Sequence, residues 1–308
     1  MSKMSLVTPL IALVAAAALA TACSRSEAPA PAAKSPQDAT AATAAAHAHD
    51  APTPTPIAEE PPKVPLLEQE IAYGAAKKRN LIGFLAMPAD AAEPLPGIIV
   101  IHEWWGLNDN IKAMTRRLAG EGYVALAVDL YGGSTADTPE KAQKLMGAVV
   151  SDPDSAKDNL KQAYDYLDKY ALAPRIGSIG WCLGGGWSLQ TALMLPDDLD
   201  AMVMYYGQIV MSEPQLATLR MPMLGFFGGQ DESIPVRDVQ NFRSTLFKLG
   251  KPVEILIYPN AKHAFANPSG GNYDAQAADD SWQKTLAFLD ENLKPKPREV
   301  AAETAEKK

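Results

Sequence analysis

Between about residue 66 and residue 294, short apolar runs rich in β-branched residues alternate with longer stretches whose apolar positions recur at helical spacing. Strands are expected at 70–73, 81–87, 97–103, 123–130, 175–180, 201–207, 223–229 and 253–259. Helices are expected at 110–122, 139–150, 155–170, from 182 onward, at 235–249 and at 275–293. Strand followed by helix, many times over, predicts one α/β domain with a mostly parallel central sheet and helices on both faces.

The residues before this domain have a different pattern. The run "LVTPLIALVAAAALATAC" is apolar, follows Lys3, and ends on the small residues 20–22, which is typical of a signal peptide over residues 1–22. We therefore expect an exported, periplasmic protein. Cys23 follows directly, so the same stretch can also be a lipoprotein signal, with Cys23 acylated and anchoring the chain to the outer membrane. A retained transmembrane anchor is the weaker interpretation, because the run is short for a membrane span.

Residues 23–65 are rich in Ala, Pro and Thr and contain almost no large apolar groups. Such a segment cannot bury enough surface to fold, so we expect a disordered linker there. His47 and His49, in "HAHD", could hold a metal ion, but two histidines in a linker are far more often bystanders. Residues 295–308 are interpreted as a charged C-terminal tail.

Charge and cysteine content narrow the class of function. The chain has 308 residues and a formal net charge of -8, with no basic cluster, which argues against nucleic acid or an anionic membrane surface as the partner. It has only two cysteines, one of them beside the signal, so a disulfide framework is excluded. Cys182 is therefore expected to be a free thiol.

Polar and aromatic residues gather where the predicted strands end. In a parallel sheet, ligands bind beyond the carboxyl ends of the strands. Those ends contain "HEWWG" (102–106), "DLYGG" (129–133), "GWCLGG" (180–185), "YYGQ" (205–208), "GGQDE" (228–232) and "PNAKHAF" (259–265). Nearly every candidate for chemistry lies in these stretches.

Gly180-x-Cys182-x-Gly184 matches a nucleophile elbow, a sharp strand-to-helix turn that exposes the nucleophile and requires small neighbours two residues away. A cysteine at the start of a helix also gains from the positive end of the helix dipole, which favours the thiolate. The alternative is that Cys182 is a small buried hydrophobic residue, the ordinary fate of a free cysteine.

An acid and then a histidine follow the nucleophile in this kind of fold. Of the four histidines, only His263 comes after Cys182, in a loop after the strand at 253–259, so it is the candidate base. Asp231 follows an earlier strand and is the candidate acid that orients the imidazole, with Glu232 as its nearest rival.

The backbone N–H of Leu183 and one near Trp104 are the candidate donors of an oxyanion hole. Five aromatic residues at strand ends could line an apolar substrate pocket or serve as packing at its rim. They are Trp104, Trp105, Tyr131, Tyr205 and Tyr206.

Taken together, "GIIVIHEWWGLNDNIKAMTRRLAGEGYVALAVDLYGG", "GSIGWCLGGGWSL", "GGQDESIPV" and "PNAKHAFANP" resemble the dienelactone hydrolase family of the α/β-hydrolase fold over residues 66–294. The resemblance implies a nucleophile at Cys182, an acid at Asp231 and a base at His263. It also implies that Glu103 interacts with the nucleophile region and assists formation of the reactive thiolate.

The chain departs from the dienelactone-specific members at two positions. Those members carry one arginine after the "DLY" motif and another shortly after the catalytic histidine, and both grip the substrate carboxylate. Here the two neighbourhoods read Gly132-Gly133 and Ala266-Asn267. We therefore expect a neutral ester, lactone or thioester of a small molecule rather than dienelactone, with no cofactor and no metal. The alternative is a non-catalytic ligand-binding protein that keeps the hydrolase fold.

Overall fold

A computed structural model describes residues 41, 43–45, 47, 50, 52–56, 60–76 and 79–295. The predictions made for residues 1–22, for Cys23 and for residues 296–308 lie outside these residues. Among the described helices, none combines the length and the apolar character that a membrane span requires.

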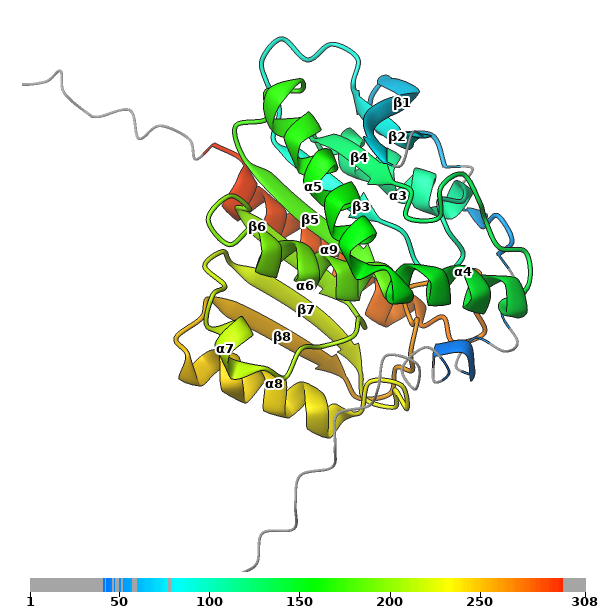
Figure 1. Cartoon of the computed structure of the whole chain (residues 1–308), viewed down its shortest axis with the longest axis vertical. Coiled ribbons are helices and arrows are strands. Elements are labelled where there is room, and N and C mark those ends of the chain that lie inside the picture. Colours follow the sequence, from blue (N-terminus) through cyan, green and yellow to red (C-terminus); the bar gives the residue numbers. More distant parts are fainter. Residues whose placement is uncertain are drawn as a thin grey trace, which may run out of the picture. The chain divides into compact units, whose positions relative to one another are not determined.

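The core of the domain is one eight-stranded sheet (Figure 1). Its strands are β1 (Leu66–Ala76), β2 (Arg79–Pro88), β3 (Gly97–Ile101), β4 (Val124–Val128), β5 (Ile176–Trp181), β6 (Ala201–Tyr205), β7 (Met223–Gly228) and β8 (Val253–Tyr258). They lie in the order β1-β2-β4-β3-β5-β6-β7-β8. The pairs β1–β2 and β2–β4 are antiparallel and all other pairs are parallel. The predicted mostly parallel sheet is thus confirmed.

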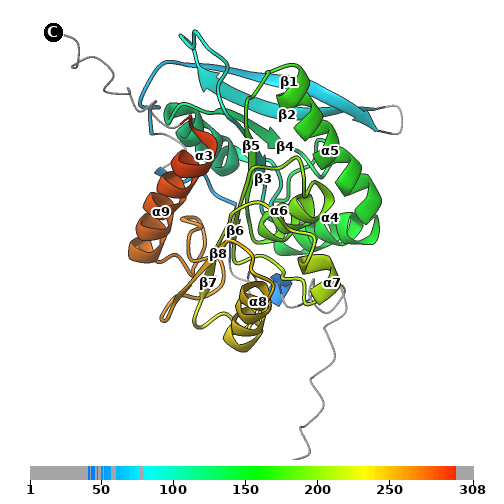
Figure 2. The ribbon, with the colours of Figure 1, turned by 90° about the vertical axis from the view of Figure 1, so that its left-hand side faces the viewer.

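Helices cover both faces of this sheet. They are α3 (Asp109–Gly120), α4 (Pro139–Ser151), α5 (Pro153–Lys169), α6 (Leu183–Met194), α7 (Glu213–Leu216), α8 (Val236–Lys248) and α9 (Ala275–Leu293). Buried residues of α3 and α9 share one core cluster, whereas those of α5, α6 and α8 share another on the opposite face. Figure 2 shows α3 and α9 on one side of the sheet and α4, α5 and α6 on the other. The alternation of strands and helices predicted this layered α/β architecture, and the resemblance to the dienelactone hydrolase family implied its α/β-hydrolase fold.

Parallel pairing aligns the carboxyl ends of the central strands at one edge of the sheet. Ile101 at the end of β3 pairs with Gly180 in β5, and Trp181 at the end of β5 pairs with Tyr205 at the end of β6. Residues that follow these strands therefore emerge side by side. The register, and not proximity in sequence, brings the candidate site together.

Several described residues of the expected linker are hydrogen-bonded to the domain. Asp50 is buried and accepts a hydrogen bond from the Gly271 amide at 3.0 Å. The Thr55 amide and hydroxyl both donate to Asn110 Oδ1 in α3, at 3.1 and 3.0 Å. His47 is fully buried. The prediction rested on the scarcity of large apolar side chains in this segment. The contacts seen here are instead hydrogen bonds between its polar groups and the domain.

Candidate active site

Cys182 occupies a strained turn between β5 and α6. Its backbone has φ 52° and ψ -114°, a conformation that non-glycine residues rarely adopt. A Cβ on Gly180 would lie 2.1 Å from the Gly184 carbonyl oxygen, and a Cβ on Gly184 would lie 2.2 Å from the Ile101 carbonyl oxygen. The glycines therefore let helix and strands approach closely enough to hold this turn, as the nucleophile-elbow interpretation predicted.

Cys182, His263 and Asp231 form a hydrogen-bonded chain. His263 Nε2 lies 3.3 Å from Cys182 Sγ, and His263 Nδ1 lies 2.7 Å from Asp231 Oδ2. The second oxygen of Asp231 accepts the amides of Ser233 and Ile234 at 2.7 and 2.9 Å, which fixes the carboxylate. Cys182 and His263 are 3% and 4% exposed, so this chain is almost fully withdrawn from water.

The two candidate acids lie in different surroundings. Asp231 is buried and bonded to His263, whereas Glu232 is exposed. The two residues are adjacent, and the turn after β7 directs only the first toward the imidazole. Sequence alone left both open because either carboxylate follows the strand.

The electrostatics of the pair favour an ionised sulfur. Burial by itself raises the pKa of the Cys182 thiol, but the charge of His263 and hydrogen bonds from His263 and His47 outweigh it and lower this pKa to about 6. Burial lowers the pKa of His263, yet the Cys182 sulfur and Asp231 raise it to about 10. A thiolate beside an imidazolium is therefore the favoured state at neutral pH.

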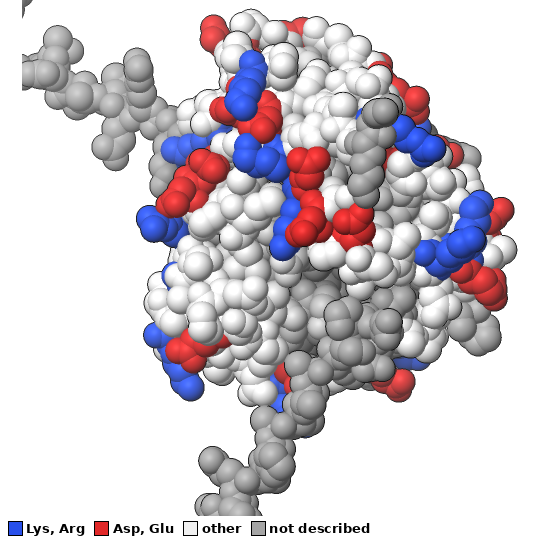
Figure 3. Space-filling view, in the orientation of Figure 1, with Lys and Arg blue, Asp and Glu red and all other residues white. Residues whose placement is uncertain are grey.

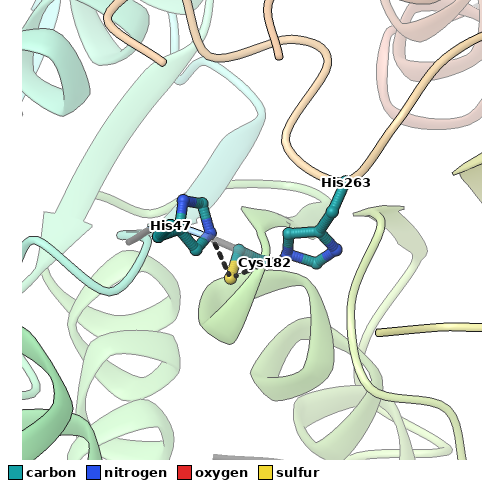
Figure 4. A group of neighbouring side chains, drawn as sticks. All are labelled: His47, Cys182 and His263. Atoms are coloured by element: carbon teal, nitrogen blue, oxygen red, sulfur yellow. Dashed lines mark hydrogen bonds between the residues drawn. The ribbon is translucent and has the colours of Figure 1, made fainter. Parts of the chain in front are cut away.

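His47, which the sequence analysis treated as a bystander, lies beside the nucleophile. Its Nε2 lies 3.7 Å from Cys182 Sγ, and its Nδ1 lies 2.6 Å from Asp50 Oδ2. Its ring stacks on Trp104, with centroids 4.6 Å apart. Figure 4 shows the imidazoles of His47 and His263 on either side of the sulfur. The one sequence signal is a histidine three residues before an aspartate in "HAHD", which is too common to locate a site.

Glu103 lies at the same edge of the sheet but does not bond the nucleophile. Asn267 Nδ2 donates to Glu103 Oε2 at 3.1 Å. Burial raises the pKa of Glu103 to about 7; the charges of Cys182 and Asp50 also raise it, while His47 and His263 oppose the shift. This carboxyl group thus changes its charge near neutral pH.

Asn267 is the second residue of the Ala266-Asn267 pair, where the dienelactone-specific members would place an arginine. Here it holds a carboxyl group of the protein itself.

The two candidate oxyanion donors follow neighbouring strands, β5 for Leu183 and β3 for Trp104. Leu183 is the first residue of α6, where a helix has no intrahelical carbonyl for its N–H groups. Trp104 lies in the loop after β3, which pairs with β5. The Trp104 carbonyl accepts the Tyr131 hydroxyl at 2.9 Å, which holds this loop in place. Both backbone positions are therefore beside the elbow.

A cavity of about 440 Å³ opens beside Cys182 and His263. Its lining is mostly apolar and comprises Thr43, Met146, Val150, Pro153, Lys157, Cys182, Leu183, Gly186, Trp187, Gln190, Tyr206, Gln208, Ile209, Val210, Ile234 and His263. Among these described residues, Lys157 is the only lysine, arginine or carboxylate. An acyl group of moderate size fits this volume and character.

Of the five aromatic candidates, Tyr206 lines this cavity. Trp104 lies against His47, while Trp105 packs with buried residues of α4 such as Met146. The Tyr131 hydroxyl donates a hydrogen bond to the Trp104 carbonyl oxygen, and the Tyr205 hydroxyl is hydrogen-bonded to the Thr285 hydroxyl at 2.7 Å. Trp105, Tyr131 and Tyr205 are not among the residues that line this cavity, which favours for them the packing role that the sequence analysis left open.

His102, which precedes Glu103, has a structural role. Its Nε2 accepts the Leu130 amide at 3.1 Å, so the proton is on Nδ1, which lies 2.6 Å from the Glu103 carbonyl oxygen. Burial lowers the pKa of His102 and keeps it neutral, with the charge of Asp129 opposing. It thereby ties the loop after β3 to the loop after β4.

Comparison with known proteins gives related sequences. A protein of Saccharolobus solfataricus named "Putative carboxymethylenebutenolidase" is 33% identical over 263 residues, which cover 72% of this chain and 98% of that protein. One of the same name from Escherichia coli K12 is 34% identical over 226 residues, covering 68% of this chain and 82% of that protein.

A solved structure is also similar. The crystal structure titled "Putative Dienelactone Hydrolase" from Klebsiella pneumoniae has a TM-score of 0.65 and 29% sequence identity, over 73% of this chain and 98% of that one. The sequence profile of the dienelactone hydrolase family matches residues 81–293, which contain the elbow, Asp231 and His263. The chain therefore belongs to the dienelactone hydrolase family.

Proposed function

We propose that this protein hydrolyses a carboxylic ester, lactone or thioester of a small uncharged molecule, with Cys182 as nucleophile, His263 as general acid and base, and Asp231 as the group that orients His263. Family membership supports a hydrolase. The observation that carries the finer proposal is the chain Cys182 Sγ to His263 Nε2, at 3.3 Å, and His263 Nδ1 to Asp231 Oδ2, at 2.7 Å. This is the relay that acyl transfer by an activated thiolate requires.

In the first half-reaction the Cys182 thiolate adds to the carbonyl carbon, and the carbonyl oxygen becomes an oxyanion within reach of the Leu183 and Trp104 amides. When the tetrahedral intermediate collapses, the C–O bond of the ester breaks. His263 gives its Nε2 proton to the departing alkoxide, which leaves as an alcohol. The acyl group remains on Sγ as a thioester.

In the second half-reaction a water molecule attacks the thioester. His263, now neutral, takes a proton from the water, so that hydroxide adds to the acyl carbon. The C–S bond then breaks, the carboxylic acid leaves, and the thiolate beside the imidazolium is restored. Asp231 stabilises each imidazolium state and keeps Nδ1 protonated.

The proposed substrate is uncharged because the cavity offers a carboxylate little compensation. Apart from the His263 imidazolium, which is paired with the Cys182 thiolate and Asp231, Lys157 is the one cationic side chain among the described residues of its lining, and it is half-buried. A buried carboxylate without a close partner costs several kcal/mol on the order-of-magnitude scale of charge burial. On the face shown in Figure 3, basic and acidic side chains lie in mixed groups rather than in a basic patch. We therefore propose an apolar acyl group beside Trp187 and Ile209.

We also propose that Glu103 is a positioning residue rather than a catalytic one. Its buried carboxyl, with a pKa raised to about 7, lies in the field of the Cys182 sulfur. A negative charge there opposes the thiolate, so the protonation of Glu103 and the ionisation of Cys182 are linked. Glu103 is still mostly protonated near pH 6, where Cys182 ionises, so Glu103→Gln should leave the midpoint of thiol alkylation nearly unchanged, and a large shift of that midpoint would mean that Glu103 is already charged there.

The test is hydrolysis of p-nitrophenyl acetate, butyrate and octanoate, and of the monoanionic p-nitrophenyl succinate, with a chelator present. We expect turnover of the neutral esters and a lower kcat/KM for the succinate. The hydrolysis rate of Cys182→Ala should fall to background, and Cys182→Ser should retain a small fraction of the wild-type rate. If the wild type is as inactive as the two variants, and its Cys182 thiol resists iodoacetamide, the non-catalytic ligand-binding alternative would be favoured instead.

A further inference from the structure

We propose that His47, Cys182 and His263 form a binding site for a thiophilic transition-metal ion of tetrahedral preference, Zn²⁺ above all, with one ligand from the N-terminal segment and two from the hydrolase domain. The donor atoms of these three residues all lie within 4.8 Å of one another. One thiolate and two imidazoles are ligands that zinc prefers.

The distances match the geometry of a zinc ion. With Zn–S about 2.3 Å and Zn–N about 2.0–2.1 Å at tetrahedral angles, a sulfur and a nitrogen ligand are about 3.6 Å apart. The two S···N distances here are 3.3 Å, to His263 Nε2, and 3.7 Å, to His47 Nε2. They bracket the expected value without rearrangement. The two ring nitrogens need to approach to about 3.3 Å, a closure of at most about 1.5 Å from the 4.8 Å limit.

A second, independent feature is the pair of carboxylates behind the imidazoles. Asp50 Oδ2 lies 2.6 Å from His47 Nδ1, and Asp231 Oδ2 lies 2.7 Å from His263 Nδ1. Both histidines thus point Nε2 at the sulfur with Nδ1 held by a carboxylate. Metal-ligating histidines almost always have this arrangement, because the carboxylate fixes the ring and raises its basicity. A single catalytic triad needs one such pair, and this site has two.

The surroundings suit an ion with three protein ligands. His47 is fully buried, and Cys182 and His263 are almost so, which keeps competing water away from the ligands. The cavity beside Cys182 and His263 leaves room for water or a small anion at a fourth position. The anionic sulfur and the carboxylates of Asp50 and Asp231 surround the ion with negative charge, which favours binding of a divalent cation.

The site also lies partly outside the family's shared sequence. The family profile begins at residue 81, so His47 and Asp50 belong to a segment that it does not include. With zinc bound, the Cys182 sulfur is a weaker nucleophile and His263 Nε2 is occupied by the ion, so attack on a carbonyl carbon and the proton transfer that follows are blocked. This last consequence, inhibition by zinc, rests on the proposed hydrolase function.

The test is a zinc titration of the full chain, stripped of metal and kept reduced with a phosphine, against a chromophoric chelator of known zinc affinity. We expect one tight site in the wild type, at least 100-fold weaker binding in His47→Ala and in Cys182→Ser, and a loss of 10- to 100-fold in Asp50→Asn, the range typical of a carboxylate behind a metal-bound histidine. His49→Ala is the matched control, since it removes the other histidine of "HAHD", and its affinity should equal that of the wild type. Circular dichroism establishes that each variant is folded.

Cobalt supplies a second readout that does not depend on affinity. Tetrahedral Co²⁺ bound to a thiolate gives intense visible bands and a sulfur-to-cobalt charge-transfer band in the near ultraviolet, which should vanish in Cys182→Ser. The proposal is overturned if zinc affinity is unaffected by His47→Ala, if His49→Ala weakens it instead, or if the cobalt complex lacks the thiolate band. No ester is used in either measurement, so a protein that binds zinc but hydrolyses nothing refutes only the proposed function.

Discussion

Two histidine–aspartate pairs face the same sulfur, and they differ in how the chain supports them. His263 and Asp231 come from loops after β8 and β7, which the sheet holds side by side, and two backbone amides fix the Asp231 carboxylate. His47 and Asp50 are three residues apart in one segment, and among the described residues one backbone amide, that of Gly271, donates to the Asp50 carboxylate. Both imidazoles contact the Cys182 sulfur, but the backbone holds the two aspartates behind them in different ways. The two pairs should therefore respond differently to the same substitution.

The largest difference is expected in catalysis. In metal-free protein, Asp231→Asn should lower kcat/KM for p-nitrophenyl butyrate on the order of 10³-fold or more, because it presents the wrong hydrogen-bonding partner to the triad imidazole. Asp50→Asn should lower it by less than about tenfold, since the general base is still in place. Steady-state kinetics measure both. Comparable losses would mean that the second pair takes part in acyl transfer.

The next effect concerns the ionisation of the thiol. With a chelator present, the rate of iodoacetamide alkylation should fall as the pH drops through about 6, where Cys182 becomes protonated. His263→Gln should move this midpoint toward about 8.5, the pKa of an ordinary cysteine. His47→Gln should move it by a smaller amount, because its nitrogen is 3.7 Å from the sulfur rather than 3.3 Å.

Mass-spectrometric quantification of the alkylated Cys182 peptide between pH 4.5 and 9.5 gives the three midpoints. A larger shift in His47→Gln than in His263→Gln would reverse the order of the two pairs. A wild-type midpoint near 8.5 would contradict the thiolate–imidazolium state itself.

The smallest effect tests how the residues before the domain, among them His47, Asp50 and Thr55, are attached to it. Asn110 is buried, accepts two hydrogen bonds from Thr55, and donates to the Thr53 carbonyl at 3.1 Å. Asn110→Ala leaves these partners unsatisfied, which should cost about 1–3 kcal/mol of the free energy of unfolding. For a domain of this size, each kcal/mol lowers Tm by about 2–4 °C.

Differential scanning calorimetry compares this variant with Asn241→Ala, an exposed asparagine in α8 whose removal should change stability by less than about 0.5 kcal/mol. The zinc affinity of Asn110→Ala should also fall, since Thr53 and Thr55 follow Asp50 closely in the chain. An unchanged Tm together with an unchanged zinc affinity would mean that this clamp does not hold the segment.

Much of the fold and the first histidine pair could be predicted from the sequence. Strands and helices follow local hydrophobic patterns, and the glycines at 180 and 184 mark a turn that only a close strand–helix approach explains. Because the acid and the base follow the nucleophile in a fixed order in this fold, His263 was found by elimination. The sequence could not distinguish Asp231 from Glu232 as the acid, because the two are adjacent and the conformation of the loop determines which carboxylate points inward.

The sequence by itself therefore determined the alternating architecture, the elbow at Cys182 and the candidate base at His263, because each depends on patterns within a few residues or on their order along the chain. Only the tertiary structure placed His47 against Cys182 with Asp50 behind it, paired Glu103 with Asn267, and left Trp105 and Tyr131 out of the cavity lining. The physical reason is that these contacts join groups far apart in sequence through polar complementarity. Neither composition nor periodicity records such complementarity.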